Sequence, residues 1–284
     1  MIGVVNSTGR FWVRIPVLAA ISLLSACAVN PPQEVNRLCP NCRSIVISPA
    51  AQLPLIAYVN GNPSPSESAF IHVYLEGDGQ PWIRGRWPAK NPSSRQLTAL
   101  RLMTRDSHPA IYLNRPCYGY KSMPEYCADE LWTNARYGAE VVDAMAFALA
   151  EFATQYPDKR WVLIGHSGGG VLATLLAGKV ENVAAVISLA ANLDHRAWTH
   201  AKGFSPLNRS LNPVDQQPLP ANIIRWHFAG GQDLQVPPQI TENAAAKDPG
   251  SRYFLEPEFD HSCCWEQIWP RILNELQAQL TGTK

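Results

Sequence analysis

The sequence predicts an α/β protein built on a mostly parallel sheet of eight strands, with helices on both faces. Short apolar runs alternate with helix-compatible segments along most of the 284 residues, and this alternation is typical of such sheets. A glycine-rich turn joins one apolar run to a helical segment at Ser167. A segment without strand pattern at 191–222 interrupts the alternation, and a connection of this length is typical of a functional loop.

Eight short runs rich in β-branched and other apolar residues predict the strands. His72 and His227 fall inside two of these runs, so we expect both to be buried or to line a face of the sheet. The predicted strands are Ser44–Ile47, Ile56–Asn60, Phe70–Leu75, Ala110–Asn114, Arg160–Gly165, Val183–Leu189, Ile223–Ala229 and Arg252–Leu255.

Helical segments are predicted between these strands and after the last one. In the second helix, apolar side chains recur with spacings close to i, i+4 and i+7, which predicts one buried stripe. This stripe consists of Val141, Val142, Met145, Leu149 and Phe152. The predicted helices are Ser94–Asp106, Thr133–Gln155, Gly169–Lys179, Pro238–Ala246 and Cys264–Leu280.

The turn Gly165–Gly169 reads Gly-His-Ser-Gly-Gly between the apolar run 161–164 and small and aliphatic residues at 171–177. A strand, a sharp turn and a helix in this order match a nucleophile elbow, where a strained serine exposes its hydroxyl. Glycines at 165, 168 and 169 allow strand and helix to approach. The pattern indicates Ser167 as a nucleophile, and the alternative is a glycine-rich turn that only packs.

Three further polar loops follow predicted strands. Residues 76–79 read Glu-Gly-Asp-Gly after the strand Phe70–Leu75. Asp233 follows the strand Ile223–Ala229, and His261 follows the last strand. Because ligands of open α/β sheets bind at the carboxyl ends of the strands, we expect these loops to lie near Ser167.

With these residues the chain resembles the α/β hydrolase superfamily over about residues 44–280. The resemblance rests on Gly165–Gly169, the Gly77–Gly79 loop, Asp233 and His261. It implies an α/β-hydrolase fold and hydrolysis by a serine nucleophile through an acyl-enzyme. The chain departs from the common pattern at Glu76, where a histidine often precedes the oxyanion glycine.

In that superfamily the nucleophile, the acid and the histidine follow in this order along the chain. The resemblance therefore implies that His261 is the general base for Ser167 and that Asp233 fixes its tautomer. For Asp233 the alternative is a turn-forming aspartate, and Asp194 is the second candidate acid. Two neighbours are excluded as partners, because His166 cannot readily turn back to Ser167 and Asp260 would point away from His261.

A tetrahedral intermediate needs N–H donors aimed at its oxyanion. We assign one donor to Gly168, directly after the nucleophile, and the second to the N–H of Asp78, with Gly79 as the near alternative. A calcium loop is a poor fit to Glu76 and Asp78, because too few oxygen ligands follow at the spacing calcium requires. We expect no metal and no cofactor.

The segment 191–222 lies between two predicted strands and carries Trp198 and Phe204. We predict that it is a lid over the carboxyl edge of the sheet, whose aromatic residues favour an apolar acyl group. The alternative is an insertion without a catalytic role.

The N-terminus has the pattern of a secretory signal peptide. Arg10 and Arg14 precede the apolar run 15–24, which is too short to span a membrane. Residues 24–27 read Leu-Ser-Ala-Cys and resemble a bacterial lipobox, which implies cleavage after residue 26 and lipidation of Cys27. The alternative is an ordinary signal peptide with an incidental cysteine.

The expected mature chain has a tether at 27–43 and a hydrolase domain at 44–284. Several acyl chains on Cys27 would anchor it firmly. The resemblance to lipoproteins of enteric bacteria, with Ala28 after the cysteine, implies sorting to the outer membrane, with the protein on the periplasmic side of a bacterial envelope. We expect a monomer.

Charge excludes a nucleic-acid partner. Loss of residues 1–26 removes two of the 24 basic side chains and none of the 23 acidic ones, so the remaining chain is nearly neutral. Nucleic-acid-binding domains instead carry a marked positive charge.

Six cysteines remain after Cys27, and an even number in an exported chain suggests disulfides. We pair Cys117 with Cys127, because together they close a loop of nine residues. Cys39, Cys42, Cys263 and Cys264 allow three pairings, which the sequence leaves open. A redox role for Cys39 and Cys42 is disfavoured, because they precede the first predicted strand.

The expected function is the hydrolysis of carboxylic esters by the catalytic set Ser167, His261 and Asp233, with a small-molecule or lipid ester as substrate. The alternative is an envelope lipoprotein that uses the same fold only to bind a partner, since a fold alone does not establish activity.

Overall fold

The computed structural model describes residues 30–50, 53–61 and 68–282. The predicted signal peptide 1–26 and the predicted lipidation site Cys27 lie outside these residues. Within the described ranges, none of the helices is both long enough and apolar enough to cross a bilayer.

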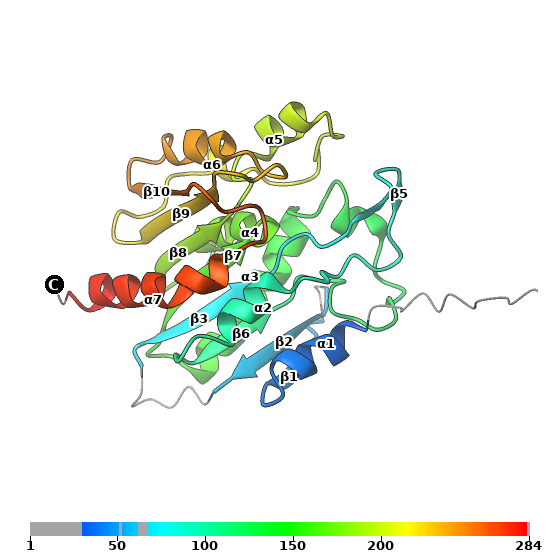
Figure 1. Ribbon diagram of the computed structural model, residues 1–284. Coiled ribbons are helices and arrows are strands. Elements are labelled where there is room, and N and C mark those ends of the chain that lie inside the picture. Colours follow the sequence, from blue (N-terminus) through cyan, green and yellow to red (C-terminus); the bar gives the residue numbers. More distant parts are fainter. Residues whose placement is uncertain (1–29, 51–52, 62–67, 283–284) are drawn as a thin grey trace, which may run out of the picture.

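An eight-stranded sheet forms the centre of the molecule (Figure 1). Only two pairings are antiparallel, namely β1 with β2 and β2 with β6, and all other neighbours are parallel. This sheet confirms the predicted fold class. In spatial order the strands are β1 (Arg43–Ile47), β2 (Leu55–Asn60), β6 (Ala110–Leu113), β3 (Phe70–Leu75), β7 (Arg160–His166), β8 (Val183–Leu189), β9 (Ile224–Gly230) and β10 (Ser251–Glu256).

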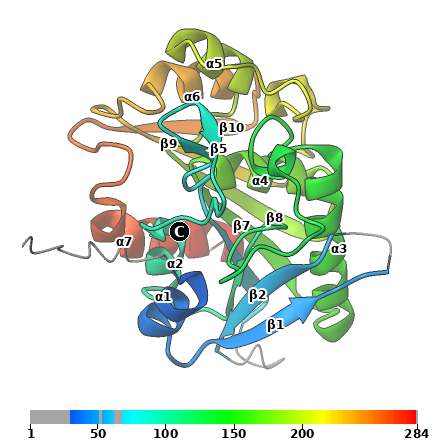
Figure 2. The same cartoon turned by 90° about the vertical axis from the view of Figure 1, so that its right-hand side faces the viewer.

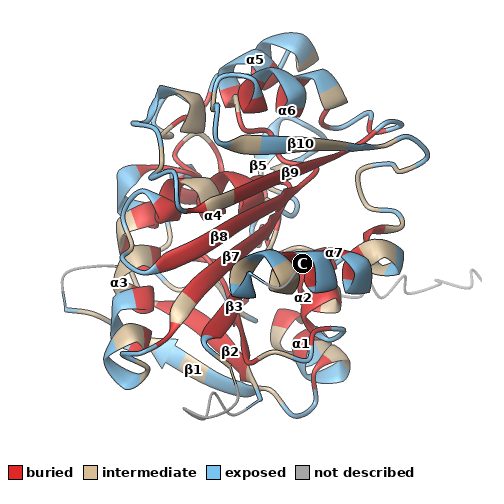
Figure 3. Ribbon diagram, turned by 90° about the vertical axis from the view of Figure 1, so that its left-hand side faces the viewer, coloured by how far each residue is buried: buried red, intermediate tan, exposed pale blue. Residues whose placement is uncertain are grey.

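Helices cover both faces of the sheet. One apolar cluster joins the strands to α3 (Ala139–Gln155), α4 (Gly168–Ala177) and the start of α6 (Pro238–Ala245). A second cluster joins the other face to α1 (Pro31–Leu38), α2 (Thr98–Met103) and α7 (Trp265–Thr281). Most residues of the central strands are buried (Figure 3).

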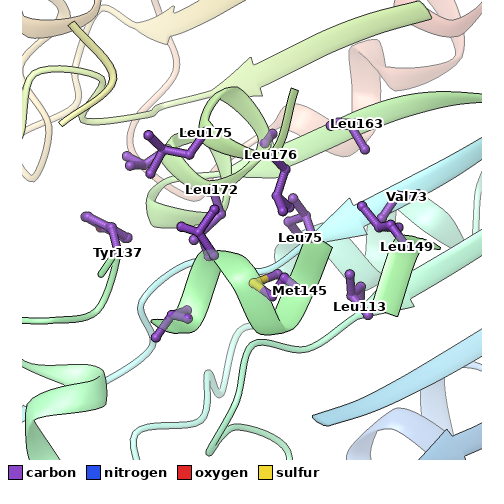
Figure 4. Packing of buried hydrophobic residues seen from close by; sticks show 14 of the residues in the cluster. Val73, Leu75, Leu113, Tyr137, Met145, Leu149, Leu163, Leu172, Leu175 and Leu176 are labelled. Atoms are coloured by element: carbon purple, nitrogen blue, oxygen red, sulfur yellow. The ribbon is translucent and has the colours of Figure 1, made fainter. Parts of the chain in front are cut away.

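The predicted apolar stripe of α3 is buried along its whole length. Removing apolar side chains of this size from water contributes about 2 kcal/mol each, which explains why the stripe faces the sheet. Figure 4 shows the stripe residues Met145 and Leu149 gathered with Leu172, Leu175 and Leu176 of α4 and with Val73, Leu75, Leu113 and Leu163 of the strands.

Two helices are shorter than predicted. Helix α2 starts at Thr98 rather than Ser94, because Leu97 has a left-handed backbone (φ 50°) that cannot belong to a right-handed helix. Helix α3 starts at Ala139 rather than Thr133, since a short 3₁₀ turn (Asp129–Trp132) and an irregular bend precede it.

Part of the predicted tether 27–43 is helical in the structure. Residues 31–38 form α1, which begins with two prolines at its first turn, a position that tolerates them. Val35 of this helix is buried and belongs to the second apolar cluster. This part of the chain therefore packs against the domain, and β1 starts at Arg43.

The loop after β3 contains a small hairpin that the sequence did not predict. Its strands are β4 (Trp82–Ile83) and β5 (Trp87–Pro88). Figure 2, which views the edge where the parallel strands end, shows this hairpin in front of the sheet and α5 (His195–Lys202) above it.

The predicted lid segment 191–222 contains α5 and a short 3₁₀ turn at Pro213–Asp215. Trp198 of α5 is 8% exposed and its indole N–H donates to the carbonyl of Gln235 at 2.8 Å. Its ring packs edge-on against Phe204, which is exposed. The segment is therefore fixed to the loop that follows β9.

Three disulfides occur among the described residues. Cys117 is bonded to Cys127, so the loop between them is closed as expected from its length. Of the pairings left open, the structure has the local ones, Cys39 with Cys42 and Cys263 with Cys264.

Candidate functional site

Ser167 lies between the end of β7 and the start of α4 with a strained backbone. Its φ of 54° and ψ of −125° are unfavourable for a residue with a side chain. The N–H of Ser167 donates to the carbonyl of Leu189 on the neighbouring strand β8 at 2.8 Å. Strand β8 therefore helps to hold the turn in the conformation expected of a nucleophile elbow.

Two glycines make this turn possible by close backbone approach. A Cβ atom on Gly165 would lie 2.1 Å from the carbonyl oxygen of Gly169, and one on Gly169 would lie 2.0 Å from that of Leu75. Such distances exclude any side chain at either position. Strand β7, helix α4 and the end of β3 meet here because these two residues have none.

Asp233 and His261 come together from two different loops. The Oδ2 atom of Asp233 lies 2.7 Å from Nδ1 of His261. The other oxygen, Oδ1, accepts hydrogen bonds from the N–H groups of Gln235 and Val236, both at 2.8 Å. Asp233 is 3% exposed. A carboxylate held in this way requires the proton on Nδ1 of His261, which leaves Nε2 as the basic nitrogen.

His166 places His261 beside the elbow. Its Nε2–H donates to the carbonyl oxygen of His261 at 2.7 Å, and the two ring centroids are 5.0 Å apart. Because His166 directly precedes Ser167, this bond brings the His261 loop to the nucleophile. Burial, together with the nearby His261 ring, lowers the pKa of His166 to about 3, so His166 is neutral at physiological pH.

The hydroxyl of Ser167 makes no hydrogen bond to His261 among the described residues. Structures of enzymes without a substrate often have long or misaligned catalytic bonds that tighten in the complex. The structure thus brings Asp233 and His261 into contact. It places His261 next to His166, the residue before Ser167. The hydrogen bond between Ser167 and His261 is not formed.

The remaining candidate acids have other roles. Asp194 caps the N-terminus of α5 by accepting from the N–H of Ala197 at 3.2 Å, and it also pairs with Lys247. Asp260 accepts from the N–H groups of Ser262 and Cys263. Neither carboxylate bonds to His261.

The loop after β3 passes directly over the elbow. A Cβ atom on Gly77 would lie 3.2 Å from that of Ser167. The two predicted oxyanion donors come directly after the residues in this contact: Asp78 follows Gly77, and Gly168 follows Ser167. Neither the N–H of Asp78 nor that of Gly168 donates a hydrogen bond to any described residue, so both are free to bind an oxyanion.

The side chain of Asp78 is the centre of a buried ionic cluster. Its carboxylate accepts from Arg115 at 2.8 Å, from Arg136 at 2.9 Å and from the hydroxyl of Tyr137 at 2.6 Å. Burial alone would raise the pKa of Asp78, but the charges of Arg136 and Arg115 and the hydrogen bond of Tyr137 lower it to about 2.

This cluster ties together three segments around the candidate oxyanion hole. Arg115 follows β6 and also donates to the carbonyl of Glu76 at 2.8 Å, while Arg136 and Tyr137 precede α3. The hydroxyl of Tyr118, inside the disulfide-closed loop, donates to the carbonyl of Asp78 at 3.1 Å. Sequence reasoning missed both arginines, because no local motif links positions 115 and 136 to position 78.

Glu76 is largely buried, and its Oε1 lies 4.0 Å from Nδ1 of His166, the residue before Ser167. Its carboxylate accepts from the N–H groups of Gly77 and Ala99 and from the hydroxyl of Tyr112. Burial raises the pKa of Glu76 in spite of these bonds. The carboxylates of Glu76 and Asp78 are therefore both engaged by protein donors.

A cavity of about 560 Å³ opens between α4, α6 and residues 211–220. His227 lies in its wall, where burial lowers the pKa of its imidazole to about 4. None of Ser167, Asp233 and His261 lines this cavity. It is therefore separate from the candidate catalytic set.

Comparison with known proteins agrees with this architecture. A family model described as the alpha/beta hydrolase fold matches residues 100–211. An esterase from Pyrococcus furiosus has a similar structure, with a TM-score of 0.58 and 14% identity over 88% of this chain and 93% of that one. No curated protein sequence matches the chain.

Two further solved structures are similar. An acylaminoacyl peptidase from Pyrococcus horikoshii has a TM-score of 0.58 and 16% identity over 84% of this chain and 42% of that one. A serine hydrolase without a lid from Xanthomonas campestris has a TM-score of 0.51 and 14% identity over 84% of this chain and 94% of that one. At such low identity these similarities establish the fold alone.

Proposed function

We propose that this chain, which has the α/β-hydrolase fold, is a serine hydrolase that cleaves carboxylic esters through an acyl-enzyme. The observation that carries the proposal is the strained Ser167 turn with the Asp233–His261 pair beside it. A strained backbone at a residue with a side chain is costly and is typically retained where chemistry needs it. The similar esterase and serine hydrolase structures support the same reaction class.

In the proposed reaction the Ser167 hydroxyl attacks the ester carbonyl carbon while His261 Nε2 takes its proton. Asp233 stabilises the imidazolium through the 2.7 Å bond to Nδ1. The N–H groups of Gly168 and Asp78 stabilise the oxyanion of the tetrahedral intermediate. His261 then returns the proton to the leaving alcohol, and the acyl group stays on Ser167.

Water releases the acyl group by the same steps in reverse order. His261 removes a proton from the water, whose oxygen attacks the acyl carbonyl, and then protonates Ser167 as the carboxylic acid leaves. His166 takes no part in these transfers, because its Nε2–H is bound to the His261 carbonyl and its imidazole stays neutral. Its role is to position the His261 loop.

The Asp78 cluster makes the oxyanion site more favourable. Two buried guanidinium groups surround a single carboxylate, so one positive charge remains uncompensated within the cluster. A positive potential in a buried environment stabilises a developing oxyanion more strongly than it would in water. Exposed Phe204 and Leu234 beside α5 support an apolar acyl group.

An ester assay tests the proposal. We expect p-nitrophenyl butyrate to be hydrolysed by the chain, and the Ser167→Ala variant to lose about 10³-fold or more in kcat. Ser122→Ala, which removes an exposed hydroxyl, is the matched control and should keep full activity. Equal rates for the Ser167→Ala variant and the unmodified chain would contradict the proposal and favour the binding-only alternative.

We further propose that the protein is a lipid-anchored component of a bacterial envelope, with cleavage after residue 26 and acylation of Cys27. The sequence pattern at 24–27 is the support for this location. Metabolic labelling with an alkyne fatty acid should mark the unmodified chain but not Cys27→Ser, and both should be exported. Equal labelling of the two would contradict acylation at this position.

A further inference from the structure

A second cluster of ionisable side chains lies near the start of strand β3, at the end of the sheet opposite to Ser167. His72 is the third residue of β3 and pairs in register with Val162, near the start of β7, whereas Ser167 follows the end of β7. Asp106 and His108 belong to the loop between α2 and β6. The start of β3 and the C-terminal end of α7 lie on this same side of the molecule (Figure 1). The cluster is therefore remote from the candidate catalytic set.

The imidazoles of His72 and His108 converge on the Asp106 carboxylate, whose Oδ2 also accepts from the hydroxyl of Tyr74. Nδ1 of His72 lies 2.6 Å from Oδ2 of Asp106, and Nδ1 of His108 lies 2.9 Å from Oδ1. The two imidazole rings stack with centroids 4.4 Å apart. A ligand atom from each of His72, Asp106 and His108 can be chosen so that all lie within 4.8 Å of one another.

The chemistry of this set is that of a transition-metal site. Two imidazole nitrogens and one carboxylate oxygen suit Zn²⁺ and its neighbours, whereas Ca²⁺ and Mg²⁺ prefer oxygen alone. Zinc binds such ligands at about 2.1 Å, so ligand atoms on one ion lie about 3.2 to 3.5 Å apart. Modest shifts of side chains within the present cluster reach this geometry.

Buried polar atoms without hydrogen-bond partners occur in and beside the cluster. Nε2 of His72 is buried without any hydrogen-bond partner among the described residues, and the residue is 2% exposed. Gln277 on α7 approaches His108, yet its Oε1 is also buried and unpaired. Leaving such atoms unsatisfied is costly, so the cluster is not a fully satisfied set of hydrogen bonds.

Among the described residues, a hollow adjoins the cluster on one side. A hollow of about 380 Å³ is lined by Asp106 and His108 together with Asn60 and Pro109. The His108 side chain is 20% exposed, while that of Asp106 is fully buried. A cation can therefore reach the carboxylate past His108, and the hollow has room for water as a further ligand.

We propose that His72, Asp106 and His108 form a binding site for one divalent transition-metal cation. The ion binds Nδ1 of each ring and an oxygen of Asp106, and each neutral imidazole then carries its one proton on Nε2 instead of Nδ1. It ties β3 to the loop before β6 and does not take part in hydrolysis. This proposal revises the expectation of a metal-free protein, and it does not depend on the proposed function.

Zinc binding to the full chain, purified in detergent without a metal-binding tag, tests the site. We expect about one Zn²⁺ per chain after dialysis against micromolar zinc, measured by elemental analysis. His108→Ala, which removes a partly exposed ligand, should weaken binding at least tenfold. His200→Ala, which removes an exposed histidine of α5, should retain one Zn²⁺. The six cysteines of the described disulfides do not compete for the ion.

Thermal unfolding distinguishes a metal site from a cluster that forms hydrogen bonds alone. Zinc should raise the Tm of the unmodified chain and of His200→Ala but not of His108→Ala, because a ligand that binds only the folded state stabilises it. Cobalt should give a visible absorption band that depends on His108. Absence of zinc binding, or equal affinity in His108→Ala, would overturn the proposal. Absence of binding by the unmodified chain overturns it even if a variant fails to fold.

Discussion

Asp78 Oδ1 fills the space beside Gly168, so that a Cβ atom at Gly168 would lie 1.9 Å from this oxygen. The same Cβ would lie 2.6 Å from the hydroxyl of Tyr137. The Asp78 cluster and the start of α4 are thus in direct contact. The position of one proposed oxyanion donor therefore depends on the position of the other.

Substitution of Gly168 by alanine should disrupt the candidate oxyanion hole. The added methyl group must displace the Asp78 carboxylate, and with it the Asp78 N–H. We expect a decrease in kcat of about 10²-fold or more, which is the effect of losing one oxyanion donor. Gly178→Ala is the control, because its nearest neighbour would lie 3.6 Å away. Steady-state kinetics on p-nitrophenyl butyrate measure both, and an unchanged kcat in Gly168→Ala would exclude this arrangement.

Asp233→Asn should leave the fold intact while removing most activity. The amide cannot stabilise the imidazolium and can hold the wrong tautomer of His261, so we expect kcat to fall by about 10⁴-fold at neutral pH. Asp260→Asn, adjacent to His261 but exposed, should change kcat by less than tenfold. Circular dichroism checks folding in both. Similar losses in the two variants would show that Asp233 is not the orienting acid.

Arg136→Met should lower both stability and activity. It leaves the buried Asp78 carboxylate with Arg115 and Tyr137 as its remaining side-chain donors, and breaking a buried ion pair costs about 3 kcal/mol. Removing this charge also raises the pKa of Asp78. Urea unfolding measures the loss, with Arg196→Met, at an exposed pair with Asp215, as the control expected to lose less than about 1 kcal/mol. Comparable losses of unfolding free energy in Arg136→Met and Arg196→Met would contradict a buried ion pair between Arg136 and Asp78.

The buried, neutral His166 should make stability depend on pH. Its pKa is lowered to about 3 in the folded chain, whereas an unfolded histidine has a pKa of about 6.5. Between these values only the unfolded state binds the proton, so the free energy of unfolding decreases as pH falls from about 6.5 towards 3. Each such group contributes a slope of about 1.4 kcal/mol per pH unit.

Urea unfolding at several pH values between 4 and 6.5 measures this slope. His166→Gln should reduce it by about the contribution of one group, whatever its overall stability. His200→Gln, at an exposed position of α5, should leave the slope unchanged. A slope in His166→Gln equal to that of the unmodified chain would mean that His166 is protonated in the folded state.

Local patterns were sufficient to predict the sheet. The strands Phe70–Leu75 and Val183–Leu189 have the predicted bounds, because a fully buried parallel strand is apolar along most of its length. The proximity of Asp233 to His261 followed from the same reasoning, since the carboxyl ends of neighbouring parallel strands meet at one edge.

Contacts between distant segments could not be predicted. Arg115 and Arg136 reach Asp78 from positions 37 and 58 residues away, and each alone looks like an ordinary surface arginine. His72 and Asp106 are 34 residues apart. The left-handed Leu97 that shortens α2 has no sequence signal, because leucine does not favour that conformation. Tertiary packing decides all of these features.

Labelling of the full chain with a fluorophosphonate, followed by peptide mapping, tests the central claim most directly, because this reagent reacts rapidly only with an activated serine. We predict one modified residue, Ser167, with labelling abolished in Ser167→Ala and strongly slowed in Asp233→Asn. Absence of labelling in the folded, unmodified chain, or modification of another serine in place of Ser167, would contradict the account.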